Sequence, residues 1–488
     1  MFNREIVSLY GLFTGIIILI LFIFISPPDD LNHAGWITAG IAILMTIWWV
    51  TEAVPIYVTG LIPIVLFPFF NIFDIQDISS SYAHPLVLLF LGGFIIASAM
   101  ESCGLHKRIA INILSFSGTS PAMIIAGFMI TTALISMWVS NTASTIMMLP
   151  IATSVIAIFS SQKQSKENDL TIPLLLAIAY SASIGGIATL IGTPTNVMLA
   201  SILSDNYNYN IGFFDWLKIG FPITLILLPV VWFFLTNIIF KLSKNKSNAL
   251  QVIISDLKKD IGKSSFAEKI VAIVFLLTAS LWILRRFINN NFDLNINDTS
   301  IGLFGALLLF IIPIKKNKRA CSWETASKIP WGVLLLVGGG IALSKAFNIT
   351  GLADWIASFS SFFDGYNIFL LIIIFVTLII FLTELNSNTA TIATFAPILI
   401  AFSIGINVNP LFFAIPCTLA ASCAFMLPVA TPPNAVIFGS GKISIKNMAK
   451  AGIILNIFSI FLVTIVSYLL LKYFFNYEIY SIPKIFIN

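Results

Sequence analysis

The sequence predicts an all-α polytopic membrane protein in which two halves of the chain repeat each other. Three observations predict this class: the composition, the alternation of charge between successive loops, and the recurrence of short motifs in the second half. Of the 488 residues, 58% are hydrophobic and 10% are charged, whereas soluble proteins carry roughly 25% charged residues. A water-soluble enzyme is therefore excluded. The net charge of +5 indicates orientation in a membrane rather than binding to nucleic acid.

Apolar stretches long enough to cross a bilayer, roughly 20 residues each, follow one another along the chain. The first ends in Ser-Pro-Pro-Asp-Asp without a small-residue cleavage site, so we expect a retained span rather than a signal peptide. Counting the loops predicts eleven spans. One lies between Lys269 and Arg285, and the others lie at about 9–25, 35–50, 56–70, 86–103, 172–203, 216–240, 301–314, 331–347, 411–439 and 453–471.

Two further apolar regions, 121–160 and 368–404, are each interrupted in the middle by Ser-Asn-Thr. The first has basic flanks and is expected to open from the cytoplasm, and the second has no basic flank and is expected to open from outside. Each region either crosses the membrane twice or enters it and turns back. Both possibilities place the following loops on the same sides, so the loop charges do not separate them.

The loop charges also predict the orientation of the chain. Lysine and arginine collect on the cytoplasmic side of short loops, and most of the 26 Lys and Arg residues lie on one predicted side, including those between 241 and 269. The N-terminus is therefore expected in the cytoplasm and the C-terminus outside, with the chain in a bacterial inner membrane. Arg285 and Arg286, at the outer end of the seventh span, are the main exceptions.

Three motifs recur in the same order at a nearly constant offset. Leu-Gly-Gly at 91–93 returns as Val-Gly-Gly at 337–339, and Ser-Asn-Thr-Ala at 140–143 returns at 387–390. Thr-Pro-Thr-Asn at 193–196 returns as Thr-Pro-Pro-Asn at 431–434. The spans that carry the first motif run in opposite directions, so the repeat is inverted, as in many secondary transporters.

The recurring motifs supply polar groups where an apolar helix would otherwise continue. Ser-Asn-Thr offers hydroxyl and carboxamide groups that compete with helical hydrogen bonds, which predicts a turn. Proline in the Thr-Pro runs cannot donate to the preceding turn, so each of these spans should be two half-helices. Broken helices present carbonyls to a cation and N-terminal amides to an anion. The alternative is that Ser-Asn-Thr only packs helices together, which is also how we interpret the Gly-Gly pairs.

Four segments closely resemble the divalent-anion:sodium symporter family of di- and tricarboxylate transporters. They are 48–55 (WWVTEAVP), 137–142 (MWVSNT), 383–389 (TELNSNT) and 421–434 (ASCAFMLPVATPPN). The resemblance implies a homodimer of eleven-span subunits with two re-entrant hairpins, in which a transport domain moves like an elevator against a scaffold. It places scaffold helices at 1–85 and 216–330, transport elements at 86–215 and 331–450, and a C-terminal helix at 451–488. The inner hairpin is expected at 121–160, the outer hairpin at 368–404, and the broken helices at 172–203 and 411–441.

The same resemblance implies the site residues. The first sodium site would use Ser136, Ser140, Asn141 and Gly192, and the second Thr383, Ser387, Asn388 and Ala430. The substrate carboxylates would be held by Asn141, Thr142, Asn388, Thr389, Thr431 and Pro432. Thr195 stands where many members of the family have a second proline, so the first-half break is expected to be softer.

The expected function is sodium-driven import of C4-dicarboxylates such as succinate, malate or fumarate. Neither motif contains Lys or Arg, so bound sodium ions would have to neutralise a dianion within the membrane. The competing functions are sodium-independent dicarboxylate exchange and sodium-coupled transport of citrate or sulfate. Lys345 could in principle approach a cation site, which would favour exchange. Glu384 is either a functional carboxylate or one bonded to the backbone amides of the hairpin, and His33, His84 and His106 are expected at the membrane interface.

Overall fold

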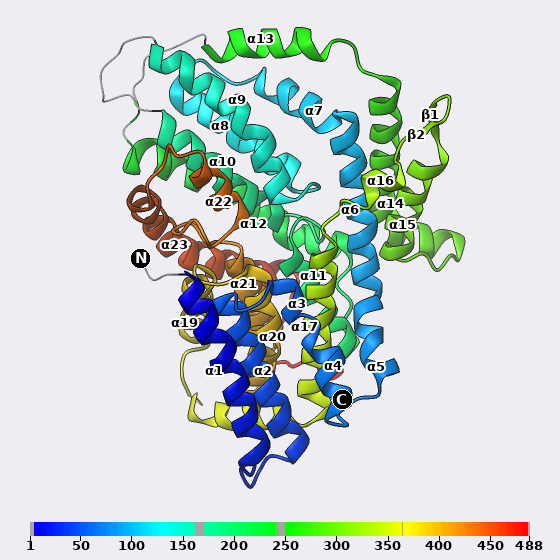
Figure 1. Cartoon of the computed structure of the whole chain (residues 1–488), viewed down its shortest axis with the longest axis vertical. Helices are drawn as coiled ribbons and strands as arrows, with labels where there is room; N and C mark the ends of the chain where they lie inside the picture. Colours follow the sequence, from blue (N-terminus) through cyan, green and yellow to red (C-terminus); the bar gives the residue numbers. More distant parts are fainter. Residues whose placement is uncertain (1–3, 162–169, 241, 243–248, 364, 487–488) are drawn as a thin grey trace.

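The computed structural model describes residues 4–161, 170–240, 242, 249–363 and 365–486 (Figure 1). The described residues form helices almost throughout, with one short hairpin of strands β1 (Pro313–Lys315) and β2 (Lys318–Arg319). The chain begins with α1 (Arg4–Phe24), α2 (His33–Thr51), α3 (Ile56–Thr59), α4 (Ile62–Phe69), α5 (Ile75–Ser80) and the 3-10 turn η1 (Ser81–Ala83).

The two halves contain the same series of helices. The first half runs through α6 (Pro85–Cys103), α7 (Leu105–Leu114), α8 (Pro121–Ser136), α9 (Asn141–Ser161), α10 (Thr171–Ile187), α11 (Pro194–Tyr207), α12 (Phe213–Phe233) and the π-helix η3 (Phe234–Ile239). The second half runs through α17 (Trp331–Ile349), α18 (Leu352–Ser358), η4 (Phe359–Phe363), α19 (Ile368–Thr383), α20 (Asn388–Gly405), α21 (Leu411–Ala421), α22 (Pro432–Gly439), α23 (Ile445–Leu469) and the π-helix η5 (Leu470–Phe474). The repeat therefore extends well beyond the three motifs.

The repeat includes the bends between its first two helices. Gly104, between α6 and α7, has φ 82°, and Gly351, between α17 and α18, has φ 73°. Residues with a side chain rarely adopt this left-handed conformation. The two glycines lie at equivalent positions of the halves, so the same backbone turn redirects the chain in each.

A linker joins the halves and the chain ends in a short tail. The linker contains α13 (Ala249–Ile261), α14 (Phe266–Phe292), α15 (Asp298–Ile311), β1, β2 and α16 (Trp323–Ala326), and the tail contains the 3-10 turn η6 (Lys484–Phe486). Tyr209 and Tyr477 hydroxyls lie 2.6 Å apart, and the Phe486 ring lies 5.4 Å from that of Tyr209. The tail therefore covers the end of α11.

Eight helices of the described chain are long and apolar enough to cross a membrane. Seven coincide with expected spans, and the eighth, α20, is the second arm of the region at 368–404. The expected spans at 56–70, 172–203, 301–314 and 411–439 contain shorter helices. A multi-pass helical membrane fold follows from these helices, and the number of eleven spans stays a prediction.

The helices at the centre of the molecule are buried on all sides. In α10, every residue from Pro173 to Ile187 is buried, and so is every residue of α21. Helix α1 is the opposite case, since most of its apolar side chains are exposed and it packs mainly on α2. A helix that is apolar on every face is buried in protein or lipid. The breaks in α10–α11 and α21–α22 therefore lie in the protein interior.

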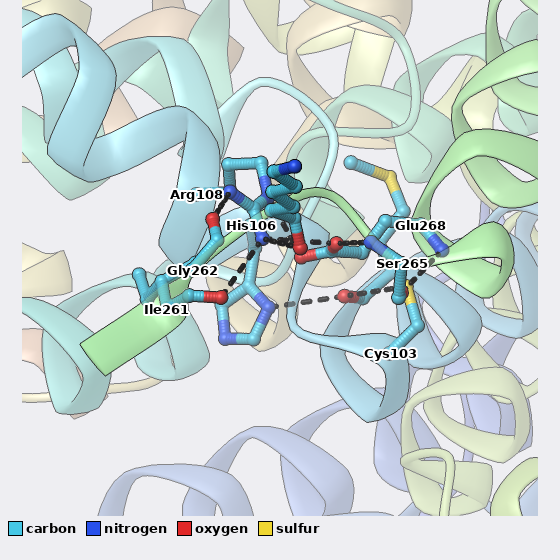
Figure 2. A network of polar contacts seen from close by, with 9 residues as sticks. Cys103, His106, Arg108, Ile261, Gly262, Ser265 and Glu268 are labelled. Carbon is cyan, nitrogen blue, oxygen red and sulfur yellow. Dashed lines mark hydrogen bonds and ion pairs between the residues drawn. The ribbon is translucent and has the colours of Figure 1, made fainter. Parts of the chain in front are cut away.

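Arg108 of α7 contacts the turn between α13 and α14 (Figure 2). Its guanidinium lies 2.9 and 3.1 Å from the Glu268 carboxylate oxygens and donates to the carbonyl oxygens of Ile261, Gly262 and Lys263. Glu268 also accepts from the Ser265 amide at 2.6 Å. Arg108 thus ties the start of α7 to the turn between α13 and α14, and it satisfies carbonyls that the end of a helix leaves free.

The two arginines that conflict with the predicted orientation are both paired with carboxylates. Arg286 lies 2.6 Å from Asp215, and Arg285 lies 3.3 Å from Asp298. These ion pairs neutralise the positive charge at this end of α14. Arg285 and Arg286 stay exceptions to the predicted orientation, and both are held at this end of α14 by carboxylates.

Candidate functional site

The first Ser-Asn-Thr motif lies at the turn of a helical hairpin formed by α8, residues 137–140 and α9. The Ser136 hydroxyl oxygen lies 2.6 Å from Asn141 Oδ1 and 2.7 Å from the carbonyl oxygen of Ala182 in α10. Ser140 accepts from the Ala143 amide at 3.3 Å, which caps the start of α9. We call the three oxygens of Ser136, Asn141 and Ala182 the first oxygen cluster.

Two glycines provide the space for this cluster. A Cβ atom on Gly186 would lie 2.6 Å from Asn141 Oδ1, and one on Gly192 would lie 2.5 Å from the Gly186 carbonyl oxygen. Either side chain would displace the neighbouring backbone or Asn141. Gly192 is thus placed beside Gly186, which in turn contacts Asn141, and the predicted members Ser136, Asn141 and Gly192 are brought together.

The second motif forms the same arrangement at the turn between α19 and α20. The Thr383 hydroxyl oxygen lies 2.6 Å from Asn388 Oδ1 and 3.1 Å from the carbonyl oxygen of Ala421 at the end of α21. Ser387 is the N-cap residue of α20. We call the oxygens of Thr383, Asn388 and Ala421 the second oxygen cluster. Each cluster thus combines a hydroxyl, a carboxamide and a carbonyl from the first half of a broken helix.

In each cluster, one hydroxyl proton faces two oxygen atoms that can accept it. A hydroxyl has one proton, whereas the amide oxygen and the carbonyl oxygen only accept. The single proton can satisfy one of the two acceptors, so one close oxygen pair is left without a shared hydrogen. Uncharged oxygens packed in this way suit a hard cation such as sodium. In the described part of the chain no group of three His, Cys, Asp or Glu residues could hold a metal ion instead.

The asparagines of the Thr-Pro-x-Asn motifs stabilise the two breaks. Asn196 Nδ2 lies 2.8 Å from the Thr189 carbonyl oxygen and 3.1 Å from that of Gly186. Asn434 Nδ2 lies 3.0 Å from the Leu427 carbonyl oxygen and 3.1 Å from that of Ala424. Both asparagines are fully buried. They bind carbonyls freed where α10 and α21 end, a role that the motif spacing did not reveal.

The two breaks face each other across the centre of the molecule. Thr195 and Ser422 hydroxyls lie 3.3 Å apart, and the Tyr180 hydroxyl donates to the Phe425 carbonyl oxygen at 2.7 Å. In addition, α22 packs on α9, and α11 packs on α20. Each broken helix therefore contacts the hairpin of the other half. Tyr180 was not predicted as a site residue, because one tyrosine in an apolar helix gives no sequence signal.

The residues expected to hold the substrate lie at helix N-termini. Asn141 and Thr142 begin α9, Asn388 and Thr389 begin α20, and Pro432 follows Thr431, the N-cap of α22. Thr431 accepts from the Asn434 amide at 3.2 Å, and Ala430 immediately precedes it. Helix N-termini carry partial positive charge and free amides, so they attract carboxylates without a basic side chain.

Glu384 is bonded to backbone amides, but these belong to the second break rather than to the hairpin. Its carboxylate accepts from the Met426 amide at 2.8 Å, from the Leu427 amide at 2.9 Å and from Asn456 Nδ2 at 2.7 Å. Asn456 comes from α23 and is fully buried. A single asparagine within a long apolar helix could have been noticed in the sequence as an unexplained polar residue.

The other ionisable candidates lie outside the clusters. Lys345 Nζ lies 5.8 Å from the centre of the Phe73 ring, in the segment between α4 and α5. His84 Nδ1 accepts from the Leu86 amide at 3.2 Å at the start of α6, and His106 Nδ1 lies 3.0 Å from the Met100 carbonyl oxygen. His33 is the first residue of α2. None of these contacts is with a residue of either oxygen cluster.

Comparisons with known proteins identify the family to which the chain belongs. Residues 7–475 match the family model described as the sodium:sulfate symporter transmembrane region. The chain is 40% identical over 473 residues to the sodium-dependent dicarboxylate transporter SdcS of Staphylococcus saprophyticus, covering 95% of this chain and 91% of that protein. It is 39% identical over 471 residues to SdcS of Staphylococcus aureus strain USA300, with 94% and 91% covered. These are transporters and not enzymes. The resemblance to divalent-anion:sodium symporters is thereby confirmed, and the chain belongs to the sodium:sulfate symporter family.

Proposed function

We propose that this protein couples sodium influx to the uptake of C4-dicarboxylates such as succinate, malate or fumarate. One observation carries the proposal: two oxygen clusters of the same composition stand at the turns of two hairpins, next to breaks that contact each other. The names of the relatives, sodium-dependent dicarboxylate transporters, support the same assignment.

In this proposal each cluster binds one sodium ion. Ser136, Ser140, Asn141 and Gly192 supply the first ion's ligands, and Thr383, Ser387, Asn388 and Ala430 supply the second ion's. The carbonyl oxygens of Ala182 and Ala421 extend these sets, because they lie within 3.1 Å of the cluster hydroxyls. Asn141 and Asn388 would contact both a sodium ion and the substrate, so the binding of sodium and the binding of substrate would be coupled.

The dicarboxylate is proposed to lie between the two clusters. Asn141, Thr142, Asn388, Thr389, Thr431 and Pro432 would hold its carboxylates at the N-termini of α9, α20 and α22. The segments 121–136, 141–161, 171–207 and 368–439 contain no Lys or Arg in the described part of the chain. Two negative charges in a site that excludes water therefore need the sodium ions as partners, since an unpaired buried charge is costly. This makes sodium binding a condition for substrate binding.

Movement of one part of the chain against another would carry the site across the membrane. We propose that the hairpins are re-entrant, that the broken helices move with them as in an elevator, and that the subunit forms a homodimer through the scaffold. Helix α12 packs on α8, α10 and α23. We therefore place α12 and α23 with the moving part, which shifts the expected boundary at residue 215. The N-terminus is proposed to lie in the cytoplasm and the C-terminus outside.

Uptake of labelled succinate into proteoliposomes tests the proposal. An inward sodium gradient should drive accumulation, and potassium or choline in its place should leave uptake at the level of empty vesicles. Unlabelled fumarate and malate should compete, whereas citrate and sulfate should compete weakly. Equal uptake in potassium would contradict sodium coupling, and stronger competition by citrate or sulfate would reassign the substrate.

A further inference from the structure

The two hairpin turns are attached to their neighbouring breaks by different chemistry. The residue after the one that supplies the cluster hydroxyl differs between the two turns. Met137 follows Ser136, whereas Glu384 follows Thr383. The Met137 carbonyl oxygen accepts from the Thr189 hydroxyl at 2.5 Å, which is a single bond between neutral groups. The Glu384 carboxylate instead binds two backbone amides of the second break and Asn456. The repeat is therefore symmetric in its oxygen clusters and asymmetric in charge.

The hydrogen bonds of Glu384 are those of an ionised carboxylate. Its three close partners, the Met426 amide, the Leu427 amide and Asn456 Nδ2, are all donors, at 2.7 to 2.9 Å. Oε1 accepts from the Met426 amide and Asn456 Nδ2, and Oε2 accepts from the Leu427 amide, so none of these partners is an acceptor for a carboxylic acid proton. The side chain is 3% exposed, so water contributes little to its stabilisation. A buried charge held by charge-assisted hydrogen bonds keeps most of its electrostatic effect on its surroundings.

The same network fixes the unwound segment that adjoins the second cluster. Asn456 Oδ1 accepts from the Phe425 amide at 3.3 Å, so Glu384 and Asn456 together bind three consecutive amides. In the same segment, Asn434 binds the carbonyls of Ala424 and Leu427. Both amides and carbonyls of the second break are thus bonded to side chains, and the segment leads to Ala430.

We propose that Glu384 is a positioning residue of the second cation site and that its charge makes this site the tighter of the two. The inference rests on the proposed function, because it presupposes that the clusters bind sodium. Adjacent residues have Cα atoms about 3.8 Å apart, so the carboxylate lies within roughly 10 Å of the Thr383 hydroxyl. At that distance, in a protein interior, one negative charge strengthens cation binding by about tenfold. The first cluster has Met137 at the equivalent position and lacks this contribution.

The inference is tested by measuring the thermal unfolding midpoint of the purified protein at increasing sodium concentrations. Choline replaces sodium so that the ionic strength stays constant. For the wild type we expect two phases of stabilisation that differ by about tenfold in sodium concentration. Glu384→Gln should shift the tighter phase to about tenfold higher sodium. The double variant Glu384→Gln with Asn456→Asp returns a carboxylate to the network and should recover most of the shift. Glu101→Gln removes an exposed carboxylate near the end of α6, a helix that contributes no residue to either cluster, and should leave the titration unchanged.

The outcomes separate the inference from the proposed function. A wild type that sodium does not stabilise overturns both. A wild type that responds to sodium, with Glu384→Gln of unchanged sodium dependence, overturns the inference alone. A purely structural role for Glu384 would lower stability without sodium and leave the sodium concentration of the tighter phase unchanged, which also overturns it.

A second pair of variants covers the case in which Glu384→Gln does not fold. Thr383→Ala and Ser136→Ala each remove the hydroxyl from one cluster. Thr383→Ala should abolish the tighter phase, and Ser136→Ala should abolish the weaker one. Equal effects of the two variants, or the reverse assignment, would overturn the claim that the second site binds more tightly.

Discussion

The two hairpin turns share one set of oxygens but have different surroundings. Beside the first cluster, the Trp138 ring lies 4.9 Å from that of Phe275 and 5.8 Å from that of Phe213, so helices α12 and α14 cover this turn. Beside the second cluster, Leu385 at the position equivalent to Trp138 is 61% exposed, and Val429 in the second break is 58% exposed. One turn is covered and the other is open.

In an inverted-repeat transporter, a difference of this kind would allow one half-site to be covered while the other is exposed. Two chemically similar half-sites need not have the same neighbours in any one conformation. The aromatic layer of Phe213, Phe275 and Trp282 belongs to α12 and α14. A transporter that opens to one side at a time requires such inequality, and we expect the opposite conformation to uncover Trp138.

The largest effect on transport should come from the asparagine that both turns contain. Asn141→Ala and Asn388→Ala each remove a cluster oxygen and a substrate contact, so both should reduce sodium-dependent succinate uptake to the level of empty vesicles. Asn237→Ala, in the exposed part of η3, is the control and should retain uptake. If only one of the two asparagine variants lost uptake, the clusters would not be functionally equivalent.

The next effect should separate the covered turn from the open one. Removing a large buried aromatic side chain costs about 3–5 kcal/mol, and Trp138 is half-buried, so Trp138→Ala should lower the free energy of unfolding by roughly 2 kcal/mol. Leu385→Ala removes an exposed side chain and should change it by less than about 0.5 kcal/mol. Thermal unfolding in detergent, with Trp138→Phe as a conservative control, measures the contrast. Similar losses for Trp138→Ala and Leu385→Ala would mean that the two turns are equally covered.

A smaller contrast is expected at the bends that follow α6 and α17. Arg108→Ala leaves Glu268, whose side chain is 7% exposed, without its guanidinium partner. Because Arg108 itself is 20% exposed, the loss should be roughly 2 kcal/mol rather than that of a fully buried ion pair.

At the second bend, Asn32 Nδ2 donates to the Thr350 carbonyl oxygen at 2.9 Å, and its side chain caps α2. Asn32→Ala should therefore cost about 1 kcal/mol. The two variants are compared by their thermal unfolding midpoints, and Arg108→Lys should recover only part of the Arg108→Ala loss, because one ammonium cannot reproduce the contacts of the guanidinium. A larger loss for Asn32→Ala than for Arg108→Ala would contradict this ranking.

The smallest effect should come from the neutral bond at the first turn. Thr189→Val removes the hydroxyl that donates to the Met137 carbonyl oxygen while keeping the shape of the side chain. A buried neutral hydrogen bond contributes about 1 kcal/mol, so stability should fall by that amount. Succinate uptake at saturating sodium should remain, since Thr189 is not a cluster residue. Complete loss of uptake in a folded Thr189→Val protein would show that this residue does more than hold the turn.

Much of the architecture can be predicted from the sequence because the relevant signals are local. Proline and its neighbours determine where a helix stops, so the motifs at 193–196 and 431–434 mark the positions where α11 and α22 begin. Ser-Asn-Thr likewise marks the starts of α9 and α20. Short helices such as α7, α13 and α18 were not predicted, because amphipathic segments of this kind lack the long apolar run that identifies a span.

The contacts within the site depend on tertiary structure and were only partly predictable. The pairing of Ser136 with Asn141 follows from a tight turn between neighbouring residues. In contrast, the hydrogen bond that Asn456 donates to Glu384 joins residues 72 positions apart, and no local pattern relates them. The same holds for Tyr180 and Phe425, which are 245 positions apart. Sequence motifs identify which residues are polar in an apolar region, whereas packing decides which of them meet.

The ratio of sodium to dicarboxylate transported tests the central claim most directly. Labelled sodium and labelled succinate can be counted in the same proteoliposomes during the initial phase of uptake. If two oxygen clusters each carry a cation beside the dicarboxylate, at least two sodium ions should enter with each succinate, and Ser136→Ala or Thr383→Ala should lower the ratio or stop uptake. A ratio of one or less in the wild type would contradict the account.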